Sequence, residues 1–184
     1  MQKSYDVLFA SSNKKKYAEV KQILKEYNIQ VGFLKFTPIE IQSDTLEEIA
    51  FDKVQQAVKC TQSPVIVEDA GLFIDSLGGF PGPYSSYVFS TLGNDGILDL
   101  LRSKRDAKFC SVIAYSSGHS TKLFSAMVQG KITRKPMGGG WGYDPIFIPK
   151  YHSKTYGEID DKNKISHRRI SLEKFANWFV HKLR

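Results

Sequence analysis

The sequence has few cysteines and no long apolar run. Its two cysteines, Cys60 and Cys110, lack the spacing of a metal site, so we expect them to be small buried side chains. No apolar stretch approaches the length needed to cross a bilayer, and residues 1–4 lead into an expected strand without a signal-peptide core. These absences predict a cytoplasmic protein that does not act in a membrane.

Standard phosphate-binding motifs are also missing. The chain has no GxxxxGK[ST] pattern, and the turn after its first expected strand lacks the dinucleotide glycine fingerprint. Three glycines at 138–140 precede no clear helix, so we expect them to give mobility to a loop. Phosphate recognition in this chain cannot rest on either motif.

The composition is that of an ordinary globular protein with a basic excess. The chain has 184 residues, of which 41% are hydrophobic and 24% charged, which suits one domain over residues 1–184, with two lobes and no separate linker. The net charge of +7 favours an anionic partner. Nucleic acid, nucleotides and acidic membranes all fit this charge, as does a solvated basic surface.

The periodicity predicts alternating strands and helices, followed by a hairpin. Helices are expected after Asn13, from Asp44 as a cap, starting in 94–101 and after Ser166. Strands are expected at 5–10, 31–36, 65–67, 109–115 and 121–129. This order favours a mixed α/β sheet. The break before the later aromatic loop suits two lobes with a cleft.

Two expected helices begin with cations, where the helix dipole disfavours them. The first starts "NKKKYAEV", with Ser11, Ser12 or Asn13 as its cap, and the last places His167, Arg168 and Arg169 after Ser166. Anions at both helix starts would explain the pattern, because helix N-termini donate N–H groups to phosphate. The alternative is that these side chains bend into water.

Carboxylates and aromatics add to this pattern. Glu68 and Asp69 follow the expected strand 65–67, and at most one of them should face a functional site because adjacent strand residues point to opposite faces; both could also merely solvate the strand end. Carboxylates beside phosphate-binding helix starts suggest Mg²⁺. Trp141 and Tyr143 either stack on a nucleobase or plug a core edge. Together these features point to a nucleotide enzyme, with a basic nucleic-acid-binding module as the rival.

Four segments, in order, resemble the signature segments of the inosine triphosphate pyrophosphatase (Ham1) family: "SSNKKK", "VEDAGLFIDSLGGFPGPYSSY", "GWGYDPIF" and "KNKISHRRISL". The resemblance implies a two-lobed α/β fold around a long mixed sheet, an active-site cleft between the lobes, and a homodimer. It also implies Mg²⁺-dependent hydrolysis of ITP, dITP and XTP to the monophosphate and pyrophosphate. That activity keeps deaminated purines out of DNA and RNA.

The resemblance assigns roles to individual residues. It implies that Asp69 is catalytic and that Glu40 and Asp69 bind the metal. It implies that Ser11, Asn13 and Lys16 hold the triphosphate and that Lys53, in the second helix, also contacts the nucleotide. It implies that Trp141 stacks on the base, with Tyr143 and Asp144 beside it. Phosphate or the purine edge is implied to contact Lys162, Asn163, Ser166, His167 and Arg168. Because Arg168 has only donors, we expect it to face the 6-carbonyl of the base.

The chain departs from the family pattern at three positions. Ala70 stands where the family usually has Ser or Thr, so any hydroxyl contact from that position is missing. Trp141 replaces a common Phe and offers a larger ring of the same kind. Ser171 replaces a usual alanine, which we interpret as neutral helix packing.

Overall fold

The computed structural model describes residues 5–183, so the expectation for residues 1–4 lies outside it. Within that range the chain forms ten main elements: β1 (Val7–Ser11), α1 (Lys14–Lys25), β2 (Val31–Lys35), α2 (Leu46–Val58), β3 (Val65–Ile74), α3 (Ser85–Leu100), β4 (Asp106–Ser116), β5 (Thr121–Ile132), β6 (Phe147–Pro149) and α4 (His167–Leu183).

The six strands form one sheet in the order β2-β1-β3-β4-β5-β6. β1 pairs in parallel with β2 and with β3, whereas β5 and β6 are antiparallel. Parallel neighbours need a crossover connection, which α1 supplies between β1 and β2. The predicted mixed α/β sheet is therefore confirmed.

The strand that carries the two acids is longer than predicted. β3 continues to Ile74, so Glu68 and Asp69 lie inside it rather than at its end. The prediction stopped at the acids because they interrupt the apolar run. Leu72 and Ile74, beyond the acids, are fully buried, and this burial extends the strand.

The chain divides into two compact units. Unit 1 comprises Met1–Asp69, Ser111–Ala126 and Arg168–Arg184, and unit 2 comprises Ala70–Cys110 and Met127–His167. β3, β4 and β5 each have residues in both units.

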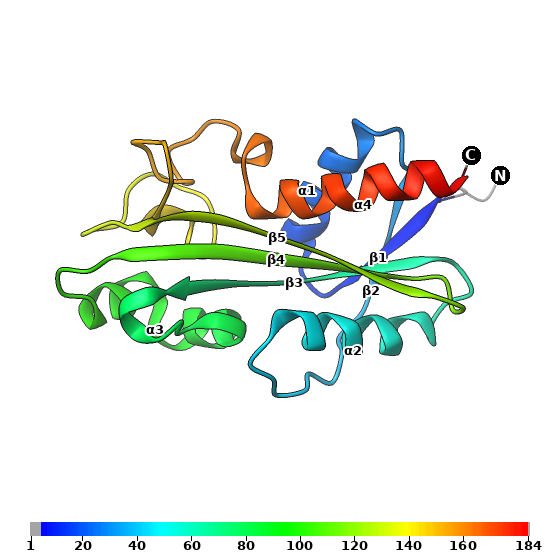
Figure 1. Cartoon of the computed structure of the whole chain (residues 1–184), viewed down its shortest axis with the longest axis horizontal. Helices are drawn as coiled ribbons and strands as arrows, with labels where there is room; N and C mark the ends of the chain where they lie inside the picture. Colours follow the sequence, from blue (N-terminus) through cyan, green and yellow to red (C-terminus); the bar gives the residue numbers. More distant parts are fainter. Residues whose placement is uncertain (1–4, 184) are drawn as a thin grey trace. The chain divides into compact units, whose positions relative to one another are not determined.

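In unit 1, α1 and α4 cover one face of the strands and α2 covers the other (Figure 1). Apolar residues at helical spacing explain this arrangement, since Val20, Ile23 and Leu24 of α1 and Leu172 and Phe175 of α4 are fully buried in one core cluster. The predicted apolar face of α2 is confirmed by its buried residues Leu46, Ile49, Ala50, Val54 and Ala57.

The helix caps of unit 1 test two local predictions. Of the three candidates for α1, Asn13 is the cap, and its side chain accepts hydrogen bonds from the N–H groups of Lys15 and Lys16 at 2.9 and 3.1 Å. The predicted Asp44 cap of α2 is wrong. Thr45 caps that helix because its hydroxyl accepts the Glu48 N–H, at 3.3 Å.

Unit 2 has its own core and a broken helix. Leu72, Val88, Ile97, Tyr143 and Phe147 belong to this core. α3 begins at Ser85, earlier than predicted, and Gly93 interrupts it with φ 65° and ψ −166°. The helix predicted to start in 94–101 is the part of α3 that follows this break.

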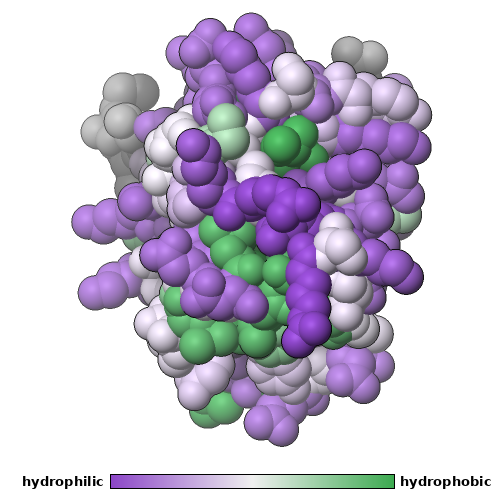
Figure 2. Space-filling view, turned by 90° about the vertical axis from the view of Figure 1, so that its left-hand side faces the viewer, coloured by the Kyte–Doolittle hydropathy of each residue, from purple (hydrophilic) through white to green (hydrophobic). Residues whose placement is uncertain are grey.

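Several surface properties bear on the sequence-based expectations. Figure 2 shows apolar side chains gathered in the middle of one face and bordered by hydrophilic ones.

Cys60 is exposed and Cys110 half-buried, so the expectation of two buried cysteines is wrong. Cys60 lies beyond the last turn of α2, where the chain has left the core. None of the helices between residues 5 and 183 has both the length and the apolar content of a membrane span.

Candidate active site

The start of α1 carries the predicted phosphate-binding residues. Lys14 and Lys15 are exposed, whereas Lys16 is half-buried and its ammonium lies 3.3 Å from Glu68 Oε2. Ser11 supports the cap, because its hydroxyl accepts the Asn13 N–H at 3.0 Å. The Asn13 side chain already takes the N–H groups of Lys15 and Lys16, so the lysine side chains supply the attraction for an anion here. The structure thus distinguishes Lys16, anchored on a carboxylate, from two lysines that face solvent.

Adjacent residues of β3 hold cations on opposite faces of the strand. Glu68 contacts Lys16 of α1 and Arg168 of α4, whereas Asp69 contacts Lys53 of α2. This alternation was predicted from the strand period. Both acids take part in charge clusters, so neither merely solvates the strand.

Arg168 is the most deeply buried cation described. It is 2% exposed, its Nε lies 2.9 Å from Glu68 Oε1, and its Nη1 pairs with Glu19. Burial lowers the pKa of Arg168, but the two carboxylates more than offset this, so its pKa lies above the ordinary value. The expected contact with a base carbonyl stays a prediction, because here the guanidinium faces carboxylates.

Lys53 lies between the two predicted metal ligands. Its ammonium is 2.7 Å from Glu40 Oε1 and 2.8 Å from Asp69 Oδ1. Burial raises the pKa of Asp69, an effect that Lys53 and Lys16 oppose without cancelling. Burial lowers the pKa of Lys53, but Asp69 and Glu40 more than compensate, so its pKa is raised. Asp69 is thus a carboxylate with increased proton affinity, held by an ammonium on one oxygen.

The second oxygen of Asp69 bears on metal binding. Asp69 Oδ2 is buried and has no hydrogen-bond partner among the described residues. The same part of the chain contains no group of three or more His, Cys, Asp or Glu side chains that could hold a metal. Mg²⁺ commonly takes one or two carboxylates and completes its shell with water and substrate phosphates. Glu40, which is exposed, and Asp69 fit that requirement.

In unit 2, the predicted base-binding loop is organised by Asp144. One carboxylate oxygen, Oδ2, accepts the Trp141 N–H at 3.2 Å and lies 2.5 Å from the Lys162 ammonium. That ammonium is also 4.9 Å from the centroid of the half-buried Trp141 ring. Cations at this distance are attracted to the face of an indole. Trp141, Asp144 and Lys162 therefore lie together, and their contact with a nucleotide stays a prediction.

Tyr143 and His167 are core side chains of unit 2. Tyr143 is 3% exposed, packs edge-on against Phe89, and donates its hydroxyl to the Ser85 carbonyl at 2.9 Å. Burial raises the pKa of Tyr143. His167 is 3% exposed and stacks on Phe109 with a ring separation of 4.0 Å. For Tyr143 the geometry favours the core alternative, and a direct nucleotide contact by either residue stays a prediction.

Two of the glycines before Trp141, Gly138 and Gly140, are closely packed, and the expected mobility of this loop stays a prediction. The Gly139 N–H donates to the Gly157 carbonyl at 2.9 Å, and a Cβ on Gly138 would lie 2.4 Å from that same carbonyl. Gly140 has φ 92°, and a Cβ there would meet Asp144 Oδ2 at 2.8 Å. Glycine is required here because backbone and carboxylate approach each other closely.

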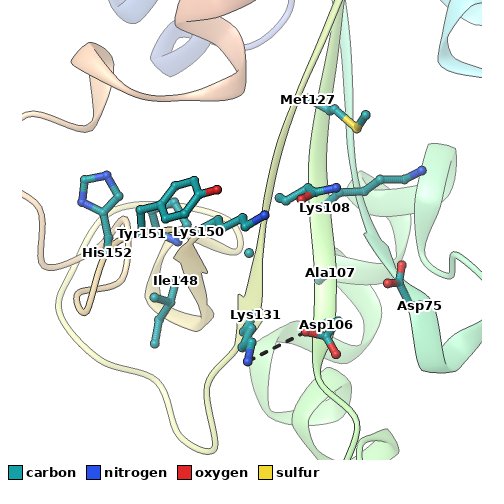
Figure 3. A pocket seen from close by; sticks show the side chains of 13 residues that line it. Asp75, Asp106, Ala107, Lys108, Met127, Lys131, Ile148, Lys150, Tyr151 and His152 are labelled. Atoms are coloured by element: carbon teal, nitrogen blue, oxygen red, sulfur yellow. Dashed lines mark ion pairs between the residues drawn. The ribbon is translucent and has the colours of Figure 1, made fainter.

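Unit 2 also has an open pocket away from these residues (Figure 3). It has a volume of about 640 Å³, and Lys108, Lys131, Lys150 and Asp106 are among the residues that line it. The pair Lys131–Asp106 is 4.0 Å apart with both side chains mostly exposed, so its attraction is weak. None of the predicted site residues lines this pocket.

The sequence pattern of the Ham1 family matches residues 7–178. The chain belongs to the Ham1 family. It is 49% identical over 179 residues to the "dITP/XTP pyrophosphatase" of Methanopyrus kandleri, covering 94% of this chain and 95% of that protein. The protein of the same name from Korarchaeum cryptofilum is 44% identical over 177 residues, covering 95% and 96%.

Solved Ham1 structures share the fold. A HAM1 protein from Coxiella burnetii has a TM-score of 0.84 at 30% identity and covers 97% of this chain and all of its own. The Staphylococcus aureus Ham1 protein has a TM-score of 0.74 at 29% identity, with 96% and 98% coverage. The α/β fold of this Ham1 chain is therefore that of its family.

Sequence reasoning missed two buried residues that contact Arg168 and Glu68 in this Ham1 protein. Glu19 was not predicted, although it lies next to Val20 on the buried side of α1, where an acid needs a partner. Ser111, which is fully buried and donates to Glu68 Oε1 at 2.8 Å, carries no local signal within its apolar strand. Glu68 was noted only as one of two acids, without its partners.

Proposed function

We propose that this chain hydrolyses dITP, XTP and ITP to the corresponding monophosphate and pyrophosphate, which keeps these bases out of DNA and RNA. The observation that carries the proposal is Asp69, whose Oδ1 is held by Lys53 and whose Oδ2 is free of hydrogen bonds among residues 5–183. The names of the two archaeal relatives support the substrate class.

Asp69 is suited to accept a proton from the attacking water. A raised pKa strengthens a carboxylate as a base, and Lys53 fixes the direction in which Oδ2 points. As the water loses its proton to Oδ2, its oxygen forms a bond to the α-phosphorus, and the bond from that phosphorus to the α–β bridging oxygen breaks. The bridging oxygen then leaves with pyrophosphate.

Glu40 and Asp69 would hold Mg²⁺ together with phosphate oxygens of the substrate. The metal would supply polarisation of those oxygens and would make a bound water more acidic. Lys53, which contacts both carboxylates, limits their mutual repulsion. Asp69 Oδ2 takes either the metal or the proton of the water, and either one would give this buried oxygen the partner that it lacks among residues 5–183.

The remaining residues bind the nucleotide. The first turn of α1, with Lys16, receives phosphate, and Lys16 and Lys53 offset the charge that develops on pyrophosphate. Trp141 offers a ring face to the base, and Lys162, held by Asp144, contributes positive charge beside it. Residue 70, next to Asp69, is an alanine, so no side-chain hydroxyl from that position contacts the nucleotide.

Turnover of a nucleotide panel tests the proposal. Purified protein is incubated with ITP, XTP, dITP, ATP and GTP and Mg²⁺, and pyrophosphate is scored against inorganic phosphate. We expect pyrophosphate from ITP, XTP and dITP, much less from ATP and GTP, and no activity in EDTA. Release of inorganic phosphate, or no turnover together with salt-sensitive DNA binding, would reject the proposal.

The state of the protein in the cell is a further part of the proposal. We expect a homodimer, and the large apolar side chains that unit 2 exposes support this: Phe80, Tyr84, Tyr87, Phe89 and Leu92. Light scattering measures the mass directly. A cytoplasmic location fits an enzyme that acts on the nucleotide pool.

A further inference from the structure

Glu68 is placed to hold two cations at once. Its side chain is completely buried, with Oε2 facing the Lys16 ammonium at 3.3 Å and Oε1 facing Arg168 Nε at 2.9 Å. Ser111 donates a third contact, to Oε1 at 2.8 Å. Because no water reaches this carboxylate, these contacts fix the direction of both oxygens.

The contacts on Oε1 are themselves held in place. The hydroxyls of Ser111 and Ser171 lie 3.0 Å apart, and Ser171 also donates to the Arg168 carbonyl at 3.0 Å. Ser111 is on β4, next to β3 in the sheet. The Glu68 carboxylate, on β3, is therefore fixed from β4 by Ser111 and from the first turn of α4 by Arg168. Ser171, expected to be neutral helix packing, is part of this arrangement.

We infer that Glu68 is a positioning residue, which fixes the Lys16 ammonium at the start of α1 for a phosphate chain, while Arg168 and Ser111 hold Glu68. A lysine has four rotatable bonds and loses much conformational freedom when it is fixed. A buried carboxylate removes that cost before the ligand arrives, which strengthens binding. The inference rests on the proposed function only in taking the phosphate chain to be that of the substrate.

Glu19 provides a matched control. Like Glu68 it is buried and pairs with Arg168, so Glu68→Gln and Glu19→Gln each leave the guanidinium with one carboxylate. We expect both variants to unfold at a lower temperature than the parent. Only Glu68→Gln also breaks the Lys16–Glu68 pair, which Glu19→Gln leaves in place. A difference in phosphate binding between the two variants therefore cannot come from lost stability, which both share.

The decisive experiment is a double-mutant cycle read out by calorimetric binding of pyrophosphate at fixed Mg²⁺. We expect Glu68→Gln to weaken pyrophosphate binding on the order of 10-fold, because Glu68 and Lys16 are in contact and residues in contact are energetically coupled. In a Lys16→Met background the same change should have no further effect, and Glu19→Gln should bind within about twofold of the parent. The KM for ITP should rise in parallel with the loss of pyrophosphate affinity.

Additive effects of Glu68→Gln and Lys16→Met would overturn the inference, as would equal binding by Glu68→Gln and Glu19→Gln. If Glu68→Gln does not fold, Ser111→Ala removes only the hydroxyl that orients Oε1, and it should weaken pyrophosphate binding in the parent but not in Lys16→Met. Turnover of ITP by the parent is a separate readout. A parent that fails to hydrolyse ITP but shows a non-additive cycle rejects the proposed function and retains the role of Glu68.

Discussion

The charged cluster of unit 1 is built from ion pairs, whereas in the aromatic loop of unit 2 one ion pair, Asp144–Lys162, holds an aromatic ring. In unit 1, Lys16, Lys53 and Arg168 each contact one or two carboxylates. In unit 2, Trp141 is held through its backbone N–H and through a cation over its ring. A buried ion pair depends on both partners, whereas a ring face depends only on its shape.

This contrast predicts which substitutions each cluster tolerates. Removal of a charge from unit 1 leaves its partner buried without compensation, so both stability and chemistry suffer. Replacement of one ring by another in unit 2 preserves the stacking surface.

Arg168→Ala should cost the most stability. It leaves Glu19 and Glu68 buried without their cation, and breaking a buried pair costs about 3–5 kcal/mol in the free energy of unfolding. Arg169→Ala is the matched control. Arg169 pairs with Glu26 and Glu173, whose side chains are 53% and 37% exposed, so about 0–1 kcal/mol is expected.

Urea unfolding monitored by circular dichroism measures both variants. A loss for Arg168→Ala no larger than that for Arg169→Ala would show that the buried cluster of unit 1 does not depend on charge. Because the variant is expected to be unstable, activity of Arg168→Ala is a poor test of base reading. Arg168→Lys keeps the charge and is the better variant for comparing ITP with ATP.

Asp69→Asn should abolish turnover while the protein stays folded. The amide keeps the shape of the carboxylate but is a poor base and a weak metal ligand. We expect kcat to fall on the order of 10²-fold or more, which corresponds to at least about 2.7 kcal/mol of barrier. Steady-state pyrophosphate release at saturating Mg²⁺ measures the loss, and substantial remaining activity would remove Asp69 from the centre of the mechanism.

The contrast between the clusters also decides what the sequence could predict. The cap and the three lysines of the first turn are contiguous, so local capping chemistry was sufficient to predict the helix start, although it left Ser11, Ser12 and Asn13 as candidate caps. The apolar faces of α1, α2 and α4 followed from helical spacing. The strand pattern drew attention to Asp69, whereas the metal and catalytic roles of Lys53, Glu40 and Asp69 came from the family resemblance and stay predictions.

Contacts between distant segments escaped prediction. Arg168 and Glu19 are 149 residues apart in the chain, and no local pattern indicates that they meet. The acids in β3 interrupt an apolar run, which made the strand seem to end there. The sequence also does not reveal that Gly157 packs against the glycines before Trp141.

Trp141→Ala should weaken nucleotide binding by about 1–3 kcal/mol if the indole stacks on the base, and Trp141→Phe should be tolerated. Trp178→Ala is the control in unit 1. Trp178 packs against the core of that unit, so its loss should lower the unfolding midpoint with little effect on ITP affinity. If Trp141→Ala instead bound ITP normally and unfolded early, the indole of unit 2 would be a core side chain.

The smallest effect is the pH dependence of stability at Asp69, measured in EDTA so that no divalent cation contributes. The pKa of Asp69 is raised in the folded state because burial outweighs the attraction of Lys53 and Lys16, so ionised Asp69 costs stability at neutral pH. As pH falls through this raised pKa toward 3.8, the folded protein takes up the proton and the cost disappears. Asp69→Asn is neutral at every pH and serves as the reference.

We therefore expect Asp69→Asn to unfold at the same or a higher temperature than the parent at pH 7. The gap should close on acidification to about pH 4, near the ordinary pKa of Asp. Differential scanning calorimetry of both proteins across this range measures it. A parent that is more stable than Asp69→Asn at pH 7, with an advantage that fades on acidification, would mean that the Lys53 pair outweighs burial. Asp69 would then be a stabilising ion-pair partner, as the carboxylates around Arg168 are.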